Sequence, residues 1–200
     1  MSEAGASIDA VVAVDWSGAL AGSERKIWLC QVEGGGVVRL DAGRTRGAVV
    51  GDVIATARRV RRLAAGFDFA FSPPGWFLGA DQVGTGSVRG MPALARLATA
   101  GFAVWPFDAP RPGEPVAVEI WPRPLYAEPV VKSSAGARAA YLARHAPDVP
   151  DAFRAAAARS DDAFDALTAA LAMWHRRDEL ATLGPAGDET ERVEGRIWGA

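Results

Sequence analysis

The N-terminal part of the chain alternates apolar runs with turn residues in the pattern of a three-stranded meander. Residues 10–15 form an apolar run typical of a strand buried on both faces. Two further strand patterns cover residues 24–33 and 37–41, and the glycines of residues 34–36 lie between them. A glycine turn between two strand patterns predicts a hairpin, so we expect the antiparallel part of a sheet here.

The rest of the chain alternates helical and strand periodicity. Apolar residues recur at three- and four-residue spacing in the helical segments and alternate with polar residues in the strands. The expected strands are residues 67–74, 102–107, 116–122 and 193–198, and the expected helices are residues 47–65, 90–100, 133–145, 151–158 and 160–178. This order predicts a single α/β domain over residues 1–200, with residues 1–8 flexible. Its mixed β-sheet, an antiparallel meander plus parallel strands, would be flanked by helices.

A glycine-rich segment at residues 78–90 is expected to form a loop. Its part 84–90 lacks the Gly-Lys-Ser/Thr ending of a phosphate-binding P-loop and follows no convincing strand directly. We therefore interpret this part as a lid or a hairpin tip.

Composition and charge are those of an ordinary soluble globular protein. The formal net charge of −2 provides no overall attraction to nucleic acid. The single cysteine, Cys30, excludes an internal disulfide framework and a multi-cysteine zinc site. Signal-peptide features and apolar runs of membrane-spanning length are missing from the sequence. We therefore expect a cytoplasmic protein with no membrane partner and leave its oligomeric state open.

Three of the expected strands carry an acidic residue, namely Asp15, Asp68 and Glu119. A carboxylate at the end of a buried strand is costly to desolvate without a partner. Either Asp15 caps a turn or a cation meets it there.

The last long helix adds further acids near its beginning. Ser160 is a good N-cap, and Asp161 and Asp162 in the first turn suit the helix dipole, which explains both acids without any function. Asp165 lies one turn further in, within a stretch that is apolar nearly all round. Since Asp162 and Asp165 share a helix face directed at the sheet, a divalent cation is the economical compensation for their charge.

Acids of this pattern offer only oxygen ligands, which favour Mg²⁺ or Mn²⁺ over zinc. Such sites commonly perform two-metal phosphoryl transfer, with ions roughly 3.5–4 Å apart that activate a water and stabilise the leaving oxygen. The competing interpretation is that each acid is a surface cap or a salt-bridge partner.

In five stretches the chain resembles the bacterial domain-of-unknown-function family numbered 429. These stretches are, in order, VAVDWSGA, GFDFAFSPPGWFL, VEIWPRPLY, the Lys132-Ser133 step and SDDAFDALTAALAMW. Members of that family are described as predicted nucleases with an RNase H-like fold. The resemblance extends from about residue 10 to residue 198 and implies an RNase H-like sheet and a metal-dependent nuclease.

The resemblance also implies a role for each matching acid. Asp15 would end the first strand and bridge the metals, and Asp68 would sit at the end of the adjacent parallel strand. Asp162 and Asp165 would close the site from the final helix, in a manner similar to the helix acids of Holliday-junction resolvases.

Three residues are candidate substrate contacts, namely Ser17, Arg123 and Lys132. The "DWSG" turn also resembles the first phosphate loop of actin-like ATPases, in which Ser17 and the neighbouring amides would cradle a phosphate. Arg123 and Lys132 are either phosphate contacts or ordinary surface charges. Glu119 has three open roles: metal ligand, general base that orients water, or partner of Arg123.

Aromatic residues and histidines add little. Trp16, Trp76 and Trp121 adjoin the acidic motifs and serve either the core or the stacking of bases. His145 and His175 have no cysteine partner, so a zinc site or a Ser-His pair is not expected.

Three hypotheses follow. The first is a Mg²⁺- or Mn²⁺-dependent phosphodiesterase that hydrolyses nucleic acid or a nucleotide by in-line attack of an activated water. The second is a nucleotide-binding or regulatory module on the same fold that hydrolyses nothing. The third is a protein-interaction scaffold whose acids act as helix and turn caps.

Overall fold

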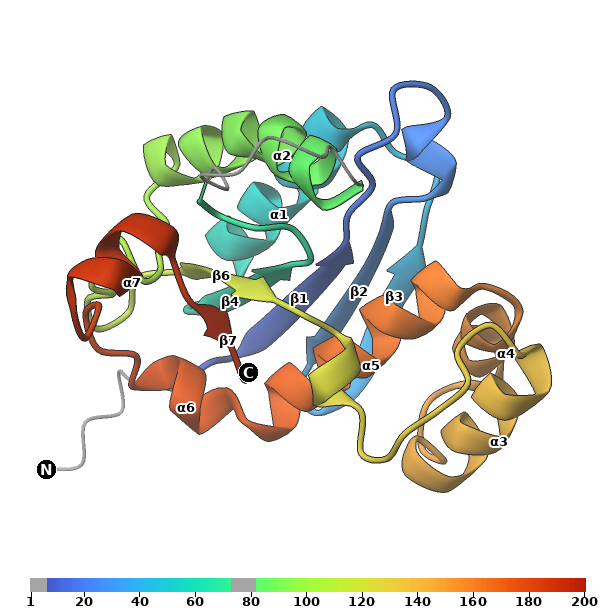
Figure 1. Cartoon of the computed structure of the whole chain (residues 1–200). Helices are drawn as coiled ribbons and strands as arrows, with labels where there is room; N and C mark the ends of the chain where they lie inside the picture. The colour runs from blue at the N-terminus through green and yellow to red at the C-terminus, as the bar shows by residue number, and fades with distance from the viewer. Residues whose placement is uncertain (1–6, 73–81) are drawn as a thin grey trace, which may run out of the picture.

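A computed structural model describes residues 7–72 and 82–200 and shows a mixed sheet that contains seven strands in these residues (Figure 1). The strands are β1 (Ala10–Asp15), β2 (Trp28–Glu33), β3 (Gly36–Asp41), β4 (Leu63–Phe67), β5 (Ala103–Val104), β6 (Val116–Ile120) and β7 (Ile197–Trp198). Their order is β3-β2-β1-β4-β6-β5, with β7 paired to β6.

The sheet combines an antiparallel and a parallel half. β1, β2 and β3 are antiparallel neighbours, whereas β4 is parallel to β1 and β6 is parallel to β4. This confirms the predicted meander and the RNase H-like arrangement of the sheet. All residues of β1 except the last are buried, as expected for a strand covered on both faces.

Helices cover both faces of the sheet. They are α1 (Arg46–Arg59), α2 (Gln82–Thr99), α3 (Ala135–His145), α4 (Asp151–Arg159), α5 (Asp161–His175), α6 (Arg177–Ala181) and α7 (Glu189–Glu194), with 3₁₀ turns η1 (Ser23–Arg25) and η2 (Arg123–Leu125). α1 and α2 pack on one face, and α5, backed by α3 and α4, packs on the other (Figure 1). None of the helices described is long and apolar enough to cross a bilayer.

The chain before β1 is only partly described. Residues 1–6 of the segment expected to be flexible lie outside the described residues. Ile8 belongs to the core, and the Asp9 amide donates to the Arg62 carbonyl at 3.0 Å. Ile8 is thus buried at the end of the segment expected to be flexible, and the expectation of flexibility for residues 1–8 stays a prediction.

Two sequence predictions around β4 were wrong. The expected helix 47–65 ends at Arg59, and residues 63–67 form β4, because a fully buried apolar run has no periodicity that separates helix from strand. The strand expected at residues 67–74 ends at Phe67. Beyond it, the Phe71 amide donates to the Glu119 carboxylate at 2.9 Å instead of joining a ladder.

The glycine-rich segment was also mispredicted, because residues 84–90 belong to helix α2. Residues 78–81 lie outside the described part of the chain. A Cβ built on Gly90 would lie 2.2 Å from Cε2 of Phe69, and one built on Gly18 would lie 2.7 Å from the Gly86 amide nitrogen. These glycines permit close packing of the helix against the chain that follows β1 and β4.

Substitution of Gly90 by Ala is expected to lower the free energy of unfolding by about 1–3 kcal/mol, because the added methyl collides with the Phe69 ring. Gly51→Ala in α1 is the matched control. Its Cβ would meet only the end of the Arg96 side chain at 3.5 Å, so the higher helix propensity of Ala should leave stability unchanged or raised by up to about 1 kcal/mol. Urea unfolding of both variants tests this, and equal effects would contradict the close-packing role.

Candidate active site

Two acids lie side by side where β1 and β4 end. The parallel register pairs Val14 with Phe67, so the next residues, Asp15 and Asp68, emerge together at the same edge of the sheet. The Asp68 amide donates to the Val14 carbonyl at 3.0 Å, which continues the ladder by one step. The predicted position of Asp68 at the end of the strand adjacent to β1 is confirmed.

Helix α5 directs further acids to this edge. The Ser160 hydroxyl caps the helix by accepting from the Ala163 amide at 3.2 Å, as predicted. Asp162 follows in the first turn, and Asp165 is buried one turn later. Small residues on the packed face, including Ala166 and Ala169, let the helix approach β1 and β2 closely.

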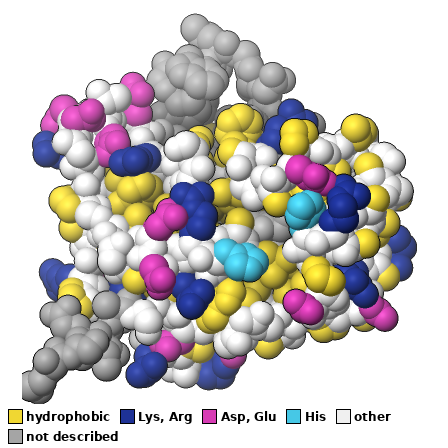
Figure 2. Space-filling view, turned by 90° about the horizontal axis from the view of Figure 1, so that it is seen from below, with side chains coloured by type: hydrophobic (Ala, Val, Ile, Leu, Met, Phe, Trp, Pro, Cys, Tyr) yellow, Lys and Arg dark blue, Asp and Glu magenta, His cyan; other side chains and the backbone are white. Residues whose placement is uncertain are grey.

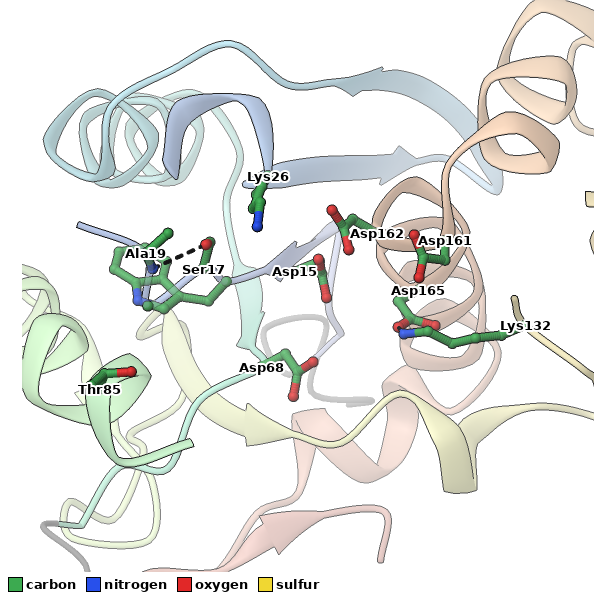
Figure 3. Close-up of a pocket in the computed structure, with 12 residues that line it drawn as sticks. Asp15, Ser17, Ala19, Lys26, Asp68, Thr85, Lys132, Asp161, Asp162 and Asp165 are labelled. Carbon is green, nitrogen blue, oxygen red and sulfur yellow. Dashed lines mark hydrogen bonds and ion pairs between the residues drawn. The ribbon is translucent and has the colours of Figure 1, made fainter. Parts of the chain in front are cut away.

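These acids line one pocket of about 590 Å³. Its lining residues are Asp15, Trp16, Ser17, Gly18, Ala19, Lys26, Asp68, Thr85, Lys132, Asp161, Asp162 and Asp165. Figure 3 shows the side chains of Asp15, Asp68 and Asp162 directed toward a common space, with Asp165 beside them. We call this pocket the acidic pocket.

Burial and mutual repulsion hold protons on the acids. Burial, reinforced by Asp68, Asp165 and Asp162, raises the pKa of Asp15 well above its ordinary value. Burial and the charge of Asp165 raise the pKa of Asp68 to about 7, although a hydrogen bond with Asp15 acts in the opposite direction. Burial and Asp161 also raise the pKa of Asp162. The nearby lysines therefore do not balance the negative charge that Asp15, Asp68 and Asp162 would carry when ionised.

Asp165 differs from the other acids because both of its oxygens are engaged. Oδ1 accepts from the Tyr126 hydroxyl, and Oδ2 forms an ion pair with Lys132. Burial acts to lower the pKa of Lys132, but the contact with Asp165 leaves it raised. The buried Arg138 donates to the carbonyls of Lys132 and Ala158, so the lysine is held in place.

The opposite wall of the acidic pocket is polar without being acidic. The Ser17 hydroxyl accepts from the Ala19 amide at 3.2 Å, which fixes the turn after Asp15. Lys26 extends into the pocket from the chain before β2 (Figure 3), and its charge acts to lower the pKa of Asp162. Thr85 of α2 completes this wall. Ser17 therefore lines the same pocket as the acids, and its contact with a phosphate stays a prediction.

Glu119 and Arg123 lie outside the acidic pocket. Glu119 is 8 % exposed in β6, and its Oε2 accepts from the Phe71 amide. Burial raises its pKa, while that hydrogen bond acts in the opposite direction. Arg123 is exposed at η2 and forms no ion pair with Glu119. Of the roles left open for Glu119, pairing with Arg123 is excluded.

The donor set of the acidic pocket suits a hard divalent cation. All candidate ligands are carboxylate oxygens, and the raised pKa values of Asp15, Asp68 and Asp162 show charge that a cation would compensate. Among residues 7–72 and 82–200, however, no three His, Cys, Asp or Glu side chains are already gathered as metal ligands.

The remaining candidates lie elsewhere. Trp16 is buried beside the acids, Trp121 is 50 % exposed, and Trp76 lies outside the described residues. His145 and His175 line a separate pocket of about 130 Å³. Figure 2 shows the two histidines on a face where basic and acidic side chains are mixed.

Comparisons of the chain with protein-family models, with curated proteins and with solved structures found no match. The functional argument for this protein therefore depends on the geometry and chemistry of its own residues.

Sequence reasoning missed three residues of the site. Tyr126 is part of the VEIWPRPLY stretch, but nothing in its spacing indicates that its hydroxyl reaches Asp165. Lys26 follows Glu24 and Arg25 in a short charged stretch before β2, and nothing local distinguishes it from an ordinary surface charge. Thr85 was assigned to a loop, and only the helical structure of its segment places it against the pocket.

The acidic pocket makes stability fall as pH rises. The folded state holds a proton on Asp68 up to about pH 7, whereas the unfolded chain releases it near its ordinary value of 3.8. This contribution is present below pH 3.8 and is lost as pH rises to about 7. We expect Tm to fall between pH 5 and pH 8 in metal-free buffer.

Asp15→Asn should reduce this fall and raise Tm at pH 8, because it removes one of the repelling carboxylates. The exposed Asp151→Asn, at the start of α4, should leave the profile unchanged. Scanning calorimetry from pH 5 to pH 8 is the measurement. Parallel profiles of wild type and Asp15→Asn would show that the carboxylates do not interact.

Lys132→Met should destabilise the protein by about 1–3 kcal/mol at pH 8, because it leaves the Asp165 carboxylate buried without its cation. The double variant Lys132→Met/Asp165→Asn should regain most of this loss, since the neutral amide still accepts from Tyr126. Urea unfolding of wild type, of Lys132→Met and of the double variant is the measurement. Equal loss in Lys132→Met and in the double variant would contradict the ion pair.

Proposed function

We propose that this protein is a Mg²⁺- or Mn²⁺-dependent phosphodiesterase that acts on nucleic acid or on a nucleotide. The observation that carries the proposal is the acidic pocket, in which Asp15, Asp68 and Asp162 face one space and have raised pKa values, because burial and mutual repulsion disfavour their charged forms. The resemblance to family 429 and its predicted nuclease activity belongs to the same proposal.

Three acids would hold the metal. Asp15 and Asp68 leave adjacent strand ends, and Asp162 comes from the first turn of α5. A bound divalent ion supplies Lewis-acid activation of water and neutralises charge on the phosphate. The expectation of two ions stays a prediction. A second ion would need Asp165 as a ligand, and both oxygens of Asp165 already have protein partners.

The protein's own residues contribute positioning and charge. Lys132, fixed by Asp165 and Arg138, presents an ammonium at the pocket wall, where it would bind a phosphate oxygen. Lys26 and the Ser17 turn would bind the phosphate from the opposite wall. Asp15 and Asp68, which share a hydrogen bond and have raised pKa values, would release their protons as the ion binds and then serve as its carboxylate ligands.

A non-hydrolytic nucleotide-binding module is the second candidate. The engagement of both Asp165 oxygens favours it, because Lys132 then provides the cation that a metal would otherwise supply. Both candidate functions predict that the protein binds phosphate groups, but only the phosphodiesterase predicts that it hydrolyses its ligand.

Asp15→Asn should reduce Mn²⁺-dependent hydrolysis of single-stranded DNA, of RNA or of a dinucleotide by at least about 10²–10³-fold, and Mn²⁺ binding should weaken in parallel. Asp162→Asn should lose less hydrolytic activity than Asp15→Asn, because Asp162 would be a single ligand contributed by the first turn of α5. The assay follows product release with and without EDTA, and calorimetry follows Mn²⁺.

Asp151→Asn is the matched control, since it makes the same change in the first turn of another helix, with its side chain 92 % exposed. Wild-type turnover in Asp15→Asn would refute the hydrolytic site. Nucleotide binding without any turnover in wild-type protein would favour the second candidate.

A further inference from the structure

A second pocket of about 600 Å³ shares Trp16, Asp68 and Lys132 with the acidic pocket. Its remaining wall is largely apolar and includes Phe69, Ile120 and other side chains around the end of β6. The phosphodiesterase proposal makes no use of this space. A concave, mostly apolar pocket with few polar groups is the usual form of a site for a small organic ring.

Trp121 supplies an aromatic surface at this second pocket. It follows β6 directly and is 50 % exposed, so part of its indole is free to contact a ligand. By contrast, Trp105 and Trp198 are buried in the core. An exposed indole beside a phosphate-binding site is the arrangement that stacks a base.

Glu119 supplies the polar contact. Its Oε2 accepts from the Phe71 amide at 2.9 Å, and no described residue donates to its Oε1. An acceptor fixed in this way within an apolar wall selects a ring that carries an N–H donor.

Trp16 adds an independent observation at the boundary between the pockets. Its indole N–H is the only buried side-chain polar atom of the described residues that lacks a hydrogen-bond partner. An unpaired buried donor is costly, and Trp16 lines both pockets. The nitrogen itself has almost no accessible surface, so the indole contributes a rigid packed wall between the two pockets.

We propose that the second pocket, here the base pocket, binds a nucleobase with an exocyclic amino group, such as adenine or cytosine. The ring would stack on Trp121 and donate to Glu119, while its phosphate lies in the acidic pocket. This inference rests on the proposed function for the phosphate, but the base pocket is testable alone with a nucleoside. Uracil and thymine, which carry a carbonyl in place of the amino group and offer Glu119 only the ring N3–H, would bind less well.

Calorimetry on the full chain with adenosine, uridine, AMP and ribose 5-phosphate tests the proposal. Adenosine should bind more tightly than uridine, and AMP more tightly than ribose 5-phosphate. Trp121→Ala should weaken adenosine binding by about 5–100-fold, and Trp121→Phe by less, because a phenyl ring still stacks. Val38→Ala, an exposed apolar residue on β3, is the control and should change nothing.

Glu119→Gln should reverse the preference for adenosine over uridine. The amide oxygen still accepts from the Phe71 amide, and the amide N–H₂ now faces the ligand, so uridine gains affinity and adenosine loses it. Wild-type adenosine affinity in Trp121→Ala, or failure of adenosine and AMP to bind, would overturn the base pocket.

Asp15→Asn separates the two proposals. It should retain adenosine binding within about twofold, because Asp15 does not line the base pocket. If adenosine binds more tightly than uridine and depends on Trp121, but wild-type protein hydrolyses no phosphodiester, the base pocket is supported and the phosphodiesterase is refuted. Hydrolysis with no preference for adenosine would refute the base pocket alone.

Discussion

The in-register parallel pairing of β1 and β4 is the constraint on which the site depends. Once Val14 pairs with Phe67, Asp15 and Asp68 must leave the sheet side by side. Their backbone positions are fixed, because the residues of β1 before Asp15 and all residues of β4 are buried. The fold thereby forces two carboxylates together at the edge where parallel strands of α/β sheets present their functional residues.

The remaining elements adjust the charge around this pair. Helix α5 adds Asp162 and Asp165, which increases the repulsion. Lys132 forms an ion pair with Asp165, and its charge only partly offsets the rise in the pKa values of Asp15, Asp68 and Asp162. The local excess of negative charge contrasts with a net charge of only −2 for the chain. An anionic substrate would therefore depend on local cations, with a divalent ion bound first.

Packing of α2 against the sheet sets the shape of the acidic pocket and of the second pocket beside it. Gly90 of α2 permits contact with the Phe69 ring, and Gly18 lets the turn after β1 approach the same helix. The chain after β4 is held by Glu119 through the Phe71 amide. As a result, Asp68 lines both a polar pocket and a largely apolar one, so the proposed phosphate site and the proposed base pocket would lie next to each other.

Sequence pattern alone determined the meander, the end of β1 at Asp15, the Ser160 cap of α5 and the shared face of Asp162 and Asp165, because these are local properties of spacing. The tertiary structure decided the rest. A buried apolar run such as β4 carries no period, and the glycines of α2 make sense only against Phe69. The partners of Asp165 and the separation of Glu119 from the acidic pocket depend on contacts between residues distant in the chain, which no local spacing records.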